Sequence, residues 1–318
     1  MTRFTTLNFQ LGLMAAVGSA MAPISLAQTN GASKTDTSKP SSEWAFEVSA
    51  GVEHDSNVSV NELDSTTGAD DVALRLRAEI DFEAKIAPET EVKFGYTISD
   101  KRYDQFTDFD LQTHIFSGTL SHDFGPATAG VTARYIDANL GGDGFQTISQ
   151  VSPYVSGFVA EKVFLRGAYT YAQKEFDIQT ARDADVQSID ADAYFFLDGS
   201  KRYIVVGLEH ETSDANDEQF SYDAVGAQAR LSQRFKFRDR TARVQAGVRF
   251  ESRDFDGETP SIGAPRQDDR TRINTEVELP LTDTVFVSAE YEYGDFSSNL
   301  PSADYSQNVF TVRIGARF

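Results

Sequence analysis

The chain has 318 residues, a formal charge of -20 and no cysteine. Lys and Arg total 29 against 49 Asp and Glu, so the chain lacks the basic footprint that nucleic-acid binding needs. The absence of cysteine excludes a fold held together by disulfides. Length alone allows one domain or two, so the organisation has to come from the order of residues along the chain.

The N-terminal segment has the features of an export signal. Arg3 gives a positive start, an apolar stretch runs from Leu11 to Ala22, and small residues end at Ala27. The pattern predicts a signal peptide over residues 1–27, followed by a flexible polar segment over residues 28–42. An N-terminal membrane anchor is the alternative, and the shortness of the apolar run disfavours it.

From Trp44 to the last residue, apolar and polar side chains alternate with a period of two, which is typical of a strand between two different environments. The clearest run, Asp71 to Ile86, has apolar residues at even positions and charged residues at odd positions, with Ala73 the one interruption. A tilted strand crosses a bilayer with about 9 to 11 residues, and this run is longer. It is therefore predicted to span a membrane.

Fourteen segments of this kind follow one another along the chain. They begin near Trp44, Asp71, Glu91, Leu111, Ala127, Phe145, Val163, Val186, Tyr203, Tyr222, Ala242, Arg270, Val285 and Ser306. Short turns alternate with longer polar loops, predicted at residues 56–70, 104–110, 139–144, 177–185, 213–219, 254–269 and 295–305.

An even number of strands with this alternation of connections is typical of an outer-membrane barrel whose termini both face the periplasm. The sequence therefore predicts an all-β fold, a transmembrane antiparallel up-and-down β-barrel of about fourteen strands over residues 43–318, in the bacterial outer membrane. A soluble β-sandwich is the alternative. Charged residues on one face of nearly every strand leave too little apolar area for two sheets to pack.

The last strand ends in a pattern that resembles the C-terminal signature of outer-membrane barrels. Phe310, Val312, Ile314 and Phe318 share one face, and Phe318 is the final residue. The resemblance implies recognition by the outer-membrane assembly machinery during biogenesis. The expected surroundings of the mature barrel are outer-membrane lipid and lipopolysaccharide.

The predicted inward face carries both signs of charge, and arginines gather on the tenth to twelfth strands. The lumen-lining candidates are Arg75, Arg77, Arg230, Arg243, Arg249, Arg253, Arg270, Arg272, Glu276, Glu278, Glu290 and Glu292. A basic wall facing an acidic wall would orient solutes in a constriction. The alternative is a salt-bridge network that stiffens the wall. We expect a channel or porin-like pore for small hydrophilic solutes.

Catalysis finds little support in the sequence. The four histidines, His54, His114, His122 and His210, follow the apolar parity of their strands and should face away from the lumen. The acidic loops show no fixed ligand spacing. We therefore expect no enzymatic activity, no cofactor, no metal and no nucleic-acid partner.

The end of the first strand reads Gly51-Val52-Glu53-His54-Asp55-Ser56-Asn57-Val58. It resembles the Gly-x-x-Tyr-Asp-Ser-Asn-Val opening of barrel domains in the surface lipoprotein assembly modifier family, whose strand number is also similar. The resemblance implies a barrel component of surface lipoprotein or polymer export, acting with a partner protein.

The sequence departs from the family pattern in two ways. His54 replaces the usual Tyr, and residues 28–42 are too short to hold the family's periplasmic helical repeats. From the residue types alone, Asp55-Ser56-Asn57 is also a turn that opens the first loop. A diffusion channel and an export barrel therefore both remain open.

Overall fold

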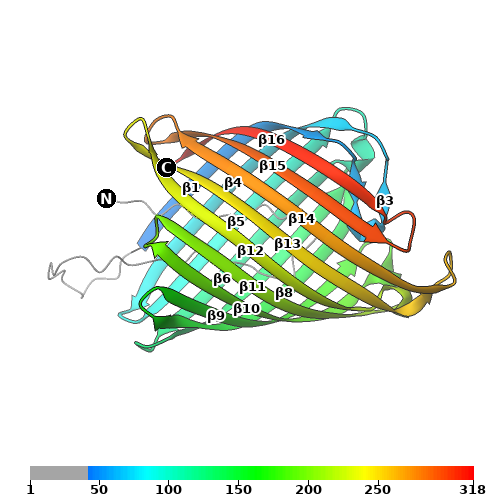
Figure 1. Cartoon of the computed structure of the whole chain (residues 1–318), viewed down its shortest axis with the longest axis horizontal. Coiled ribbons are helices and arrows are strands. Elements are labelled where there is room, and N and C mark those ends of the chain that lie inside the picture. The colour runs from blue at the N-terminus through cyan, green and yellow to red at the C-terminus, as the bar shows by residue number, and fades with distance from the viewer. Residues whose placement is uncertain (1–41) are drawn as a thin grey trace.

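The computed structural model describes residues 42–318, which form a closed antiparallel barrel of fourteen strands (Figure 1). The barrel strands are β1 (Ser42–Asp55), β4 (Asp71–Ala87), β5 (Thr90–Tyr103), β6 (Leu111–Asp123), β7 (Thr128–Leu140), β8 (Asp143–Ala160), β9 (Val163–Phe176), β10 (Ala184–Asp198), β11 (Arg202–Ala215), β12 (Tyr222–Phe237), β13 (Arg240–Thr259), β14 (Ala264–Pro280), β15 (Val285–Ser298) and β16 (Tyr305–Arg317). The predicted fold class and strand number are confirmed. The predicted signal peptide and the flexible segment, apart from Ser42, lie outside the described residues.

Each barrel strand pairs with its neighbours in the sequence, and β1 closes the sheet by pairing with β16. A small hairpin, β2 (Ser59–Val60) and β3 (Ser65–Thr66), lies between β1 and β4, with the 3-10 turn η2 (Asn61–Leu63) at its tip. Three further 3-10 turns follow in other connections: η3 (Thr107–Phe109), η4 (Thr180–Arg182) and η5 (Glu218–Phe220). No helix within residues 42–318 is long and apolar enough to cross a membrane.

The small hairpin and the C-terminus lie at opposite ends of the barrel (Figure 1). Both termini of such barrels face the periplasm, so we assign the end with the C-terminus as periplasmic and the end with the hairpin as extracellular. Two predicted loops are wrong. Residues 254–269 are largely strand, because β13 reaches Thr259 and β14 begins at Ala264, with a register shift after Asp254. Residues 139–144 shrink to a tight turn at Gly141 and Gly142, whose φ angles are 62° and 92°.

The alternation seen in the sequence separates the two faces of the wall. Leu74 and Leu76 on β4 are exposed on the outer surface, whereas Arg75 and Arg77, which alternate with them, are half-buried on the inner one. Lipid accommodates the apolar face, and the closed ladder satisfies the backbone groups that hydrocarbon could not. The long alternating run therefore reflects the two environments of the sheet, lipid on the outside and the lumen on the inside.

The seam between β1 and β16 pairs Glu47 with Arg317. Phe318, just past the end of β16, continues the pairing, because its N–H donates to the Phe46 carbonyl at 2.9 Å and its own carbonyl accepts from Phe46 at 3.2 Å. The assembly-signal candidates Phe310, Val312, Ile314 and Phe318 are all exposed on the outer face.

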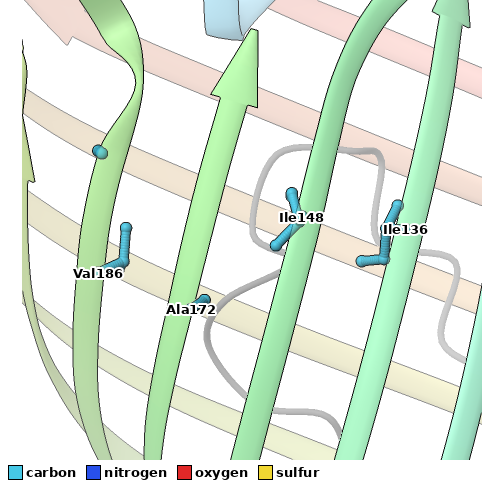
Figure 2. Packing of buried hydrophobic residues seen from close by; sticks show 5 residues of the cluster. Ile136, Ile148, Ala172 and Val186 are labelled. Carbon is cyan, nitrogen blue, oxygen red and sulfur yellow. The ribbon is translucent and has the colours of Figure 1, made fainter.

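The lumen is not uniformly polar. Near the extracellular end, Ile136, Ile148, Ala172 and Val186 form a buried apolar cluster on the adjacent strands β7 to β10 (Figure 2). Near the periplasmic end of β9 to β11, a second cluster contains Tyr194, Phe196 and Val205 with Phe164 and Tyr203 packed against it. The inner wall is thus apolar near the extracellular end of β7 to β10 and near the periplasmic end of β9 to β11, and the charged strands β13 to β15 lie across the barrel from it.

Candidate functional site

The twelve lumen candidates all lie on strand faces that are buried or half-buried, opposite the exposed apolar residues. Arg75 and Arg77 are on β4, Arg230 on β12, Arg243, Arg249 and Arg253 on β13, Arg270, Arg272, Glu276 and Glu278 on β14, and Glu290 and Glu292 on β15. The structure brings most of those on β13 to β15 into two ion-pair networks.

The first network surrounds Glu251 in the extracellular half. This carboxylate accepts hydrogen bonds from Arg253 Nε at 2.6 Å and Arg249 Nη2 at 3.0 Å, and Arg270 Nη1 lies 3.7 Å away. Arg249 also pairs with Glu209 on β11. Carboxylates from β11 and β13 thus surround these arginines and hold their guanidinium groups in one geometry.

The second network lies nearer the periplasmic end, around the glutamates of β14. Arg243 lies 3.7 Å from Glu276 and 3.5 Å from Glu278. Arg313 on β16 reaches Glu276 at 3.5 Å and Glu290 at 3.3 Å, and Arg317 reaches Glu278 at 2.7 Å. Acidic and basic side chains therefore interleave along one stretch of wall.

A third group of charges lies beside the seam. Arg75 Nη1 donates to Glu53 Oε2 at 2.7 Å, and the Thr311 hydroxyl donates to the same oxygen at 3.2 Å. Arg77 pairs with Glu79 at 2.8 Å. Glu53 belongs to the family-like stretch of the first strand, so this stretch contributes to the lumen wall as well as to the turn that follows it.

Asp55 and Asn57, predicted with Ser56 to open the first loop, and the following Val58 turn this loop into the barrel. The Asn57 N–H donates to Asp55 Oδ1 at 3.0 Å, as in an Asx turn, and Asn57 Oδ1 accepts from the Gly68 N–H at 3.0 Å. Tyr103 on β5 donates its hydroxyl to Asp55 Oδ2 at 2.8 Å. Val58 is fully buried against Tyr103 and Ala73. We call residues 56–70 the lumen hairpin.

The tip of the lumen hairpin packs on the opposite wall. Val60 and Leu63 lie against an apolar cluster of Ala138 on β7, Phe145 on β8 and Phe176 on β9. These strands are separated from β1 and β4 by at least two strands in either direction around the barrel. The hairpin therefore crosses the extracellular opening.

An acidic residue at the tip fixes the hairpin on two sides. Asp64 Oδ2 accepts from Arg182 Nη2 and Asp64 Oδ1 accepts from Arg266 Nη1, both at 2.7 Å. Arg182 also donates to the Glu62 carbonyl at 2.8 Å. Arg182 belongs to η4 between β9 and β10, and Arg266 belongs to β14. We call these three side chains the Asp64 clamp.

The sequence predicted the loop at residues 56–70 but not its position inside the barrel. Neither Asp64 nor its two arginines was among the predicted lumen residues. One local signal was present, namely the apolar residues Val58, Val60 and Leu63 within an otherwise polar loop. Apolar side chains do not stabilise a loop that is surrounded by water, whereas they do stabilise a loop that packs against the barrel wall.

The histidines lie away from the lumen networks. His54 Nε2 lies 3.5 Å from an Asp70 carboxylate oxygen, and both side chains are exposed. His114 shares a hydrogen bond of 2.9 Å with the Tyr96 hydroxyl, and His122 shares one of 2.9 Å with Thr90. Within residues 42–318, no group of three or more His, Cys, Asp or Glu side chains is placed to hold a metal ion.

This barrel, with its first loop turned inward by the motif residues, matches a known protein family. The model of the surface lipoprotein assembly modifier family matches residues 44–318. The chain belongs to the surface lipoprotein assembly modifier family. The predicted resemblance is thereby confirmed, and it extends from eight residues to the whole barrel. A search of curated proteins returns no match.

Solved structures that resemble this member of the surface lipoprotein assembly modifier family are outer-membrane barrels. OmpT of Vibrio cholerae has 13% identity and a TM-score of 0.49, with 90% of this chain and 99% of that chain covered. An anion-selective porin from Comamonas acidovorans has 10% identity and a TM-score of 0.46, with 88% and 100% covered. These likenesses concern the fold alone. The family member described here is a β-barrel of the bacterial outer membrane.

Proposed function

We propose that this barrel assists the delivery of lipoproteins to the cell surface, acting with a partner protein. Membership of the surface lipoprotein assembly modifier family supports the proposal. The observation that carries it is the lumen hairpin, which crosses the extracellular opening and is fixed by the Asp64 clamp. A hairpin fixed across the opening limits free diffusion, which favours a barrel that opens for a particular task over a permanently open pore.

The barrel acts in this proposal without chemistry of its own. Its histidines lie on outward-facing strand positions, and the charges on β13 and β14 are engaged with one another. A general base needs to reach a reacting group within hydrogen-bonding distance, and the paired side chains are already committed to their partners. Surface delivery then depends on how the lipoprotein is bound and on its passage to the surface.

A second candidate is a porin-like pore for small hydrophilic solutes. The charged wall from β13 to β16 favours it, because fixed ion pairs in a lumen hydrate readily and can sort solutes by charge. In this case the lumen hairpin would narrow the pore without closing it.

Two measurements separate the candidates. In cells that lack the protein, the lipoproteins open to protease on intact cells should decrease while their total amount stays constant, and the full chain should restore them. Exposure of unrelated outer-membrane proteins is the control. Single-channel recording of the purified barrel should show little steady conductance. Unchanged lipoprotein display together with a stable ohmic conductance would contradict the proposal and favour the pore.

A further inference from the structure

Basic side chains without acidic partners gather at the periplasmic end of β12. Consecutive strands run in opposite directions, so the turn between β12 and β13 lies at the same end of the barrel as the C-terminus. Arg234 and Lys236 are in the last turn-ward residues of β12, and Arg238 follows in the turn, where Lys236 and Arg238 are exposed. None of the three forms an ion pair with a residue in the described range 42–318. We call these three residues the basic corner.

The carboxylates closest in the chain to the basic corner do not neutralise it. Asp198 pairs with Lys201 at 3.3 Å, and Asp283 pairs with Arg240 at 3.1 Å. Asp239 is exposed in the turn and forms no ion pair with any part of the chain that the structure describes. The basic corner therefore keeps an excess of positive charge, on a chain whose formal charge is -20.

Arg234 also faces a like charge. It stands directly opposite Arg243 on the ladder of β12 and β13. Arg243 has two carboxylates nearby, Glu276 at 3.7 Å and Glu278 at 3.5 Å. Like charges directly opposite each other on a ladder are destabilising, and an acidic group brought by another molecule would relieve the repulsion on the Arg234 side.

Aromatic rings cover the inner face of the neighbouring strands at the same end. The ring centroid of Phe158 on β8 lies 5.1 Å from that of Phe164 on β9 and 5.8 Å from that of Phe196 on β10. The Phe196 and Tyr203 centroids, on β10 and β11, are 5.8 Å apart. Phe158 is 50% exposed, so the group presents an open apolar surface at the periplasmic opening. We call these four rings the aromatic shelf.

The aromatic shelf and the basic corner adjoin each other. Tyr203 stands opposite Ser232 on the ladder of β11 and β12, and Arg234 is the next residue of β12 on the same face. The Arg234 N–H donates to the Lys201 carbonyl at 2.7 Å, which ties the end of β12 to the start of β11. One surface therefore runs along the inner rim of the barrel from β8 to β12.

This surface faces away from the bilayer. Leu231 and Phe235 occupy the outward positions of β12 and are exposed on the lipid side, whereas Arg234 and Lys236 occupy the alternate positions. A molecule that reaches them comes from the periplasm. Basic side chains bind carboxylates through charge-assisted hydrogen bonds, and exposed rings bind apolar side chains. A protein segment with acidic and apolar residues side by side provides both.

We infer that the aromatic shelf and the basic corner together form the docking site for an acidic segment of a periplasmic protein, with apolar side chains of that segment on the rings. The inference rests on the proposed function, which requires a partner protein. It assigns to that partner a chemistry and a place at the periplasmic entrance of the lumen.

The test uses the folded full-length barrel in detergent, with heat-modifiable migration on gels as the check of folding. A short fluorescent peptide of Glu residues with Phe and Leu between them is titrated with the barrel, and binding is measured by fluorescence anisotropy. The wild type should bind saturably, and more weakly as salt is added. Arg234→Gln and Lys236→Gln should each weaken the affinity about three- to tenfold, and Phe158→Ser about threefold or more.

Arg102→Gln is the matched control, because this arginine is 63% exposed and lies near the extracellular end of β5. Its peptide affinity should stay within about twofold of the wild type. A peptide with Lys in place of Glu should not bind saturably. Absence of saturable binding of the Glu peptide, or equal affinity in all variants, would overturn the inference. Loss of binding when phosphatidylglycerol is added to the micelles would also overturn it, because lipid headgroups would then be the occupant.

Lipoprotein display on intact cells separates this inference from the proposed function. A barrel with both Arg234→Gln and Lys236→Gln should reach the outer membrane in the normal amount and yet display fewer lipoproteins to protease. If deletion of the protein lowers display and this double variant restores it fully, the docking site is wrong and the proposed function stands. If deletion leaves display unchanged, the proposed function is wrong, and the peptide titration still decides whether the site binds an acidic segment.

Discussion

Asp64→Asn should release the lumen hairpin from the opposite wall while leaving the barrel intact. Asp64 has a φ angle of 52°, in the left-handed region, and Asn is among the residues that adopt this region most readily. The substitution keeps the shape of the side chain. It replaces one carboxylate oxygen by an amide that cannot accept from an arginine, so one arm of the Asp64 clamp is lost and the other is weakened.

The expected size follows from the partners that remain. A hydrogen bond to a charged group contributes about 1.5 to 3 kcal/mol. Arg266 keeps its bonds to Asp268 at 2.7 and 2.8 Å, and Arg182 keeps its place over the Phe220 ring. Neither arginine is left without a partner, so we expect a loss of about 2 to 3 kcal/mol, below the 3 to 5 kcal/mol typical of orphaning a buried charge. The undocked population should rise roughly 30- to 150-fold.

Cysteine labelling measures that population, since the chain has no cysteine of its own. Ala138, under the hairpin tip, is 2% exposed, and Ala138→Cys provides the reporter. Its reaction with a membrane-impermeant maleimide on intact cells should accelerate with the undocked population when docking is fast relative to labelling. Asp70→Asn is the control, because that side chain is 74% exposed. Equal labelling rates in Asp64→Asn and Asp70→Asn would refute the clamp.

Three other predictions concern the barrel wall. Arg75→Cys should react with a water-soluble maleimide and Leu74→Cys should not, because only the first faces the lumen; equal reaction of both would contradict the assigned faces. Glu47→Gln removes a seam ion pair to Arg317 and should lower stability by only about 0.2 to 1 kcal/mol, measured by urea denaturation in detergent. Deletion of Phe318 removes the two backbone bonds to Phe46, and the amount of heat-modifiable barrel in the outer membrane should fall sharply; a normal amount would show that the last residue is dispensable.

The strands could be predicted because the period of two is imposed by the two environments on either side of a barrel wall. The long β13–β14 hairpin was missed for a local reason. Gly257, Pro260 and Pro265 have the composition of a loop, yet the ladder continues past the register shift after Asp254. Whether two strands stay paired beyond the membrane depends on the partner strand. The sequence of one segment alone does not identify that partner.

The site was less predictable than the wall, because its contacts join residues far apart in the chain. Asp64 reaches Arg182 and Arg266, and no spacing in the sequence relates these three positions.

The family-like stretch and the lumen hairpin explain each other. Asp55 receives hydrogen bonds from the Asn57 N–H, the Tyr103 hydroxyl and Gln307 Nε2, which come from the loop, from β5 and from β16. A carboxylate with three donors from three elements fixes the direction in which the chain leaves β1. Asn57 then closes the base of the hairpin through Gly68. Asp and Asn at these positions therefore do more than terminate a strand, because they direct residues 56–70 across the lumen to the Asp64 clamp. His54, where the family has Tyr, lies on the exposed outer face and takes no part in this turn.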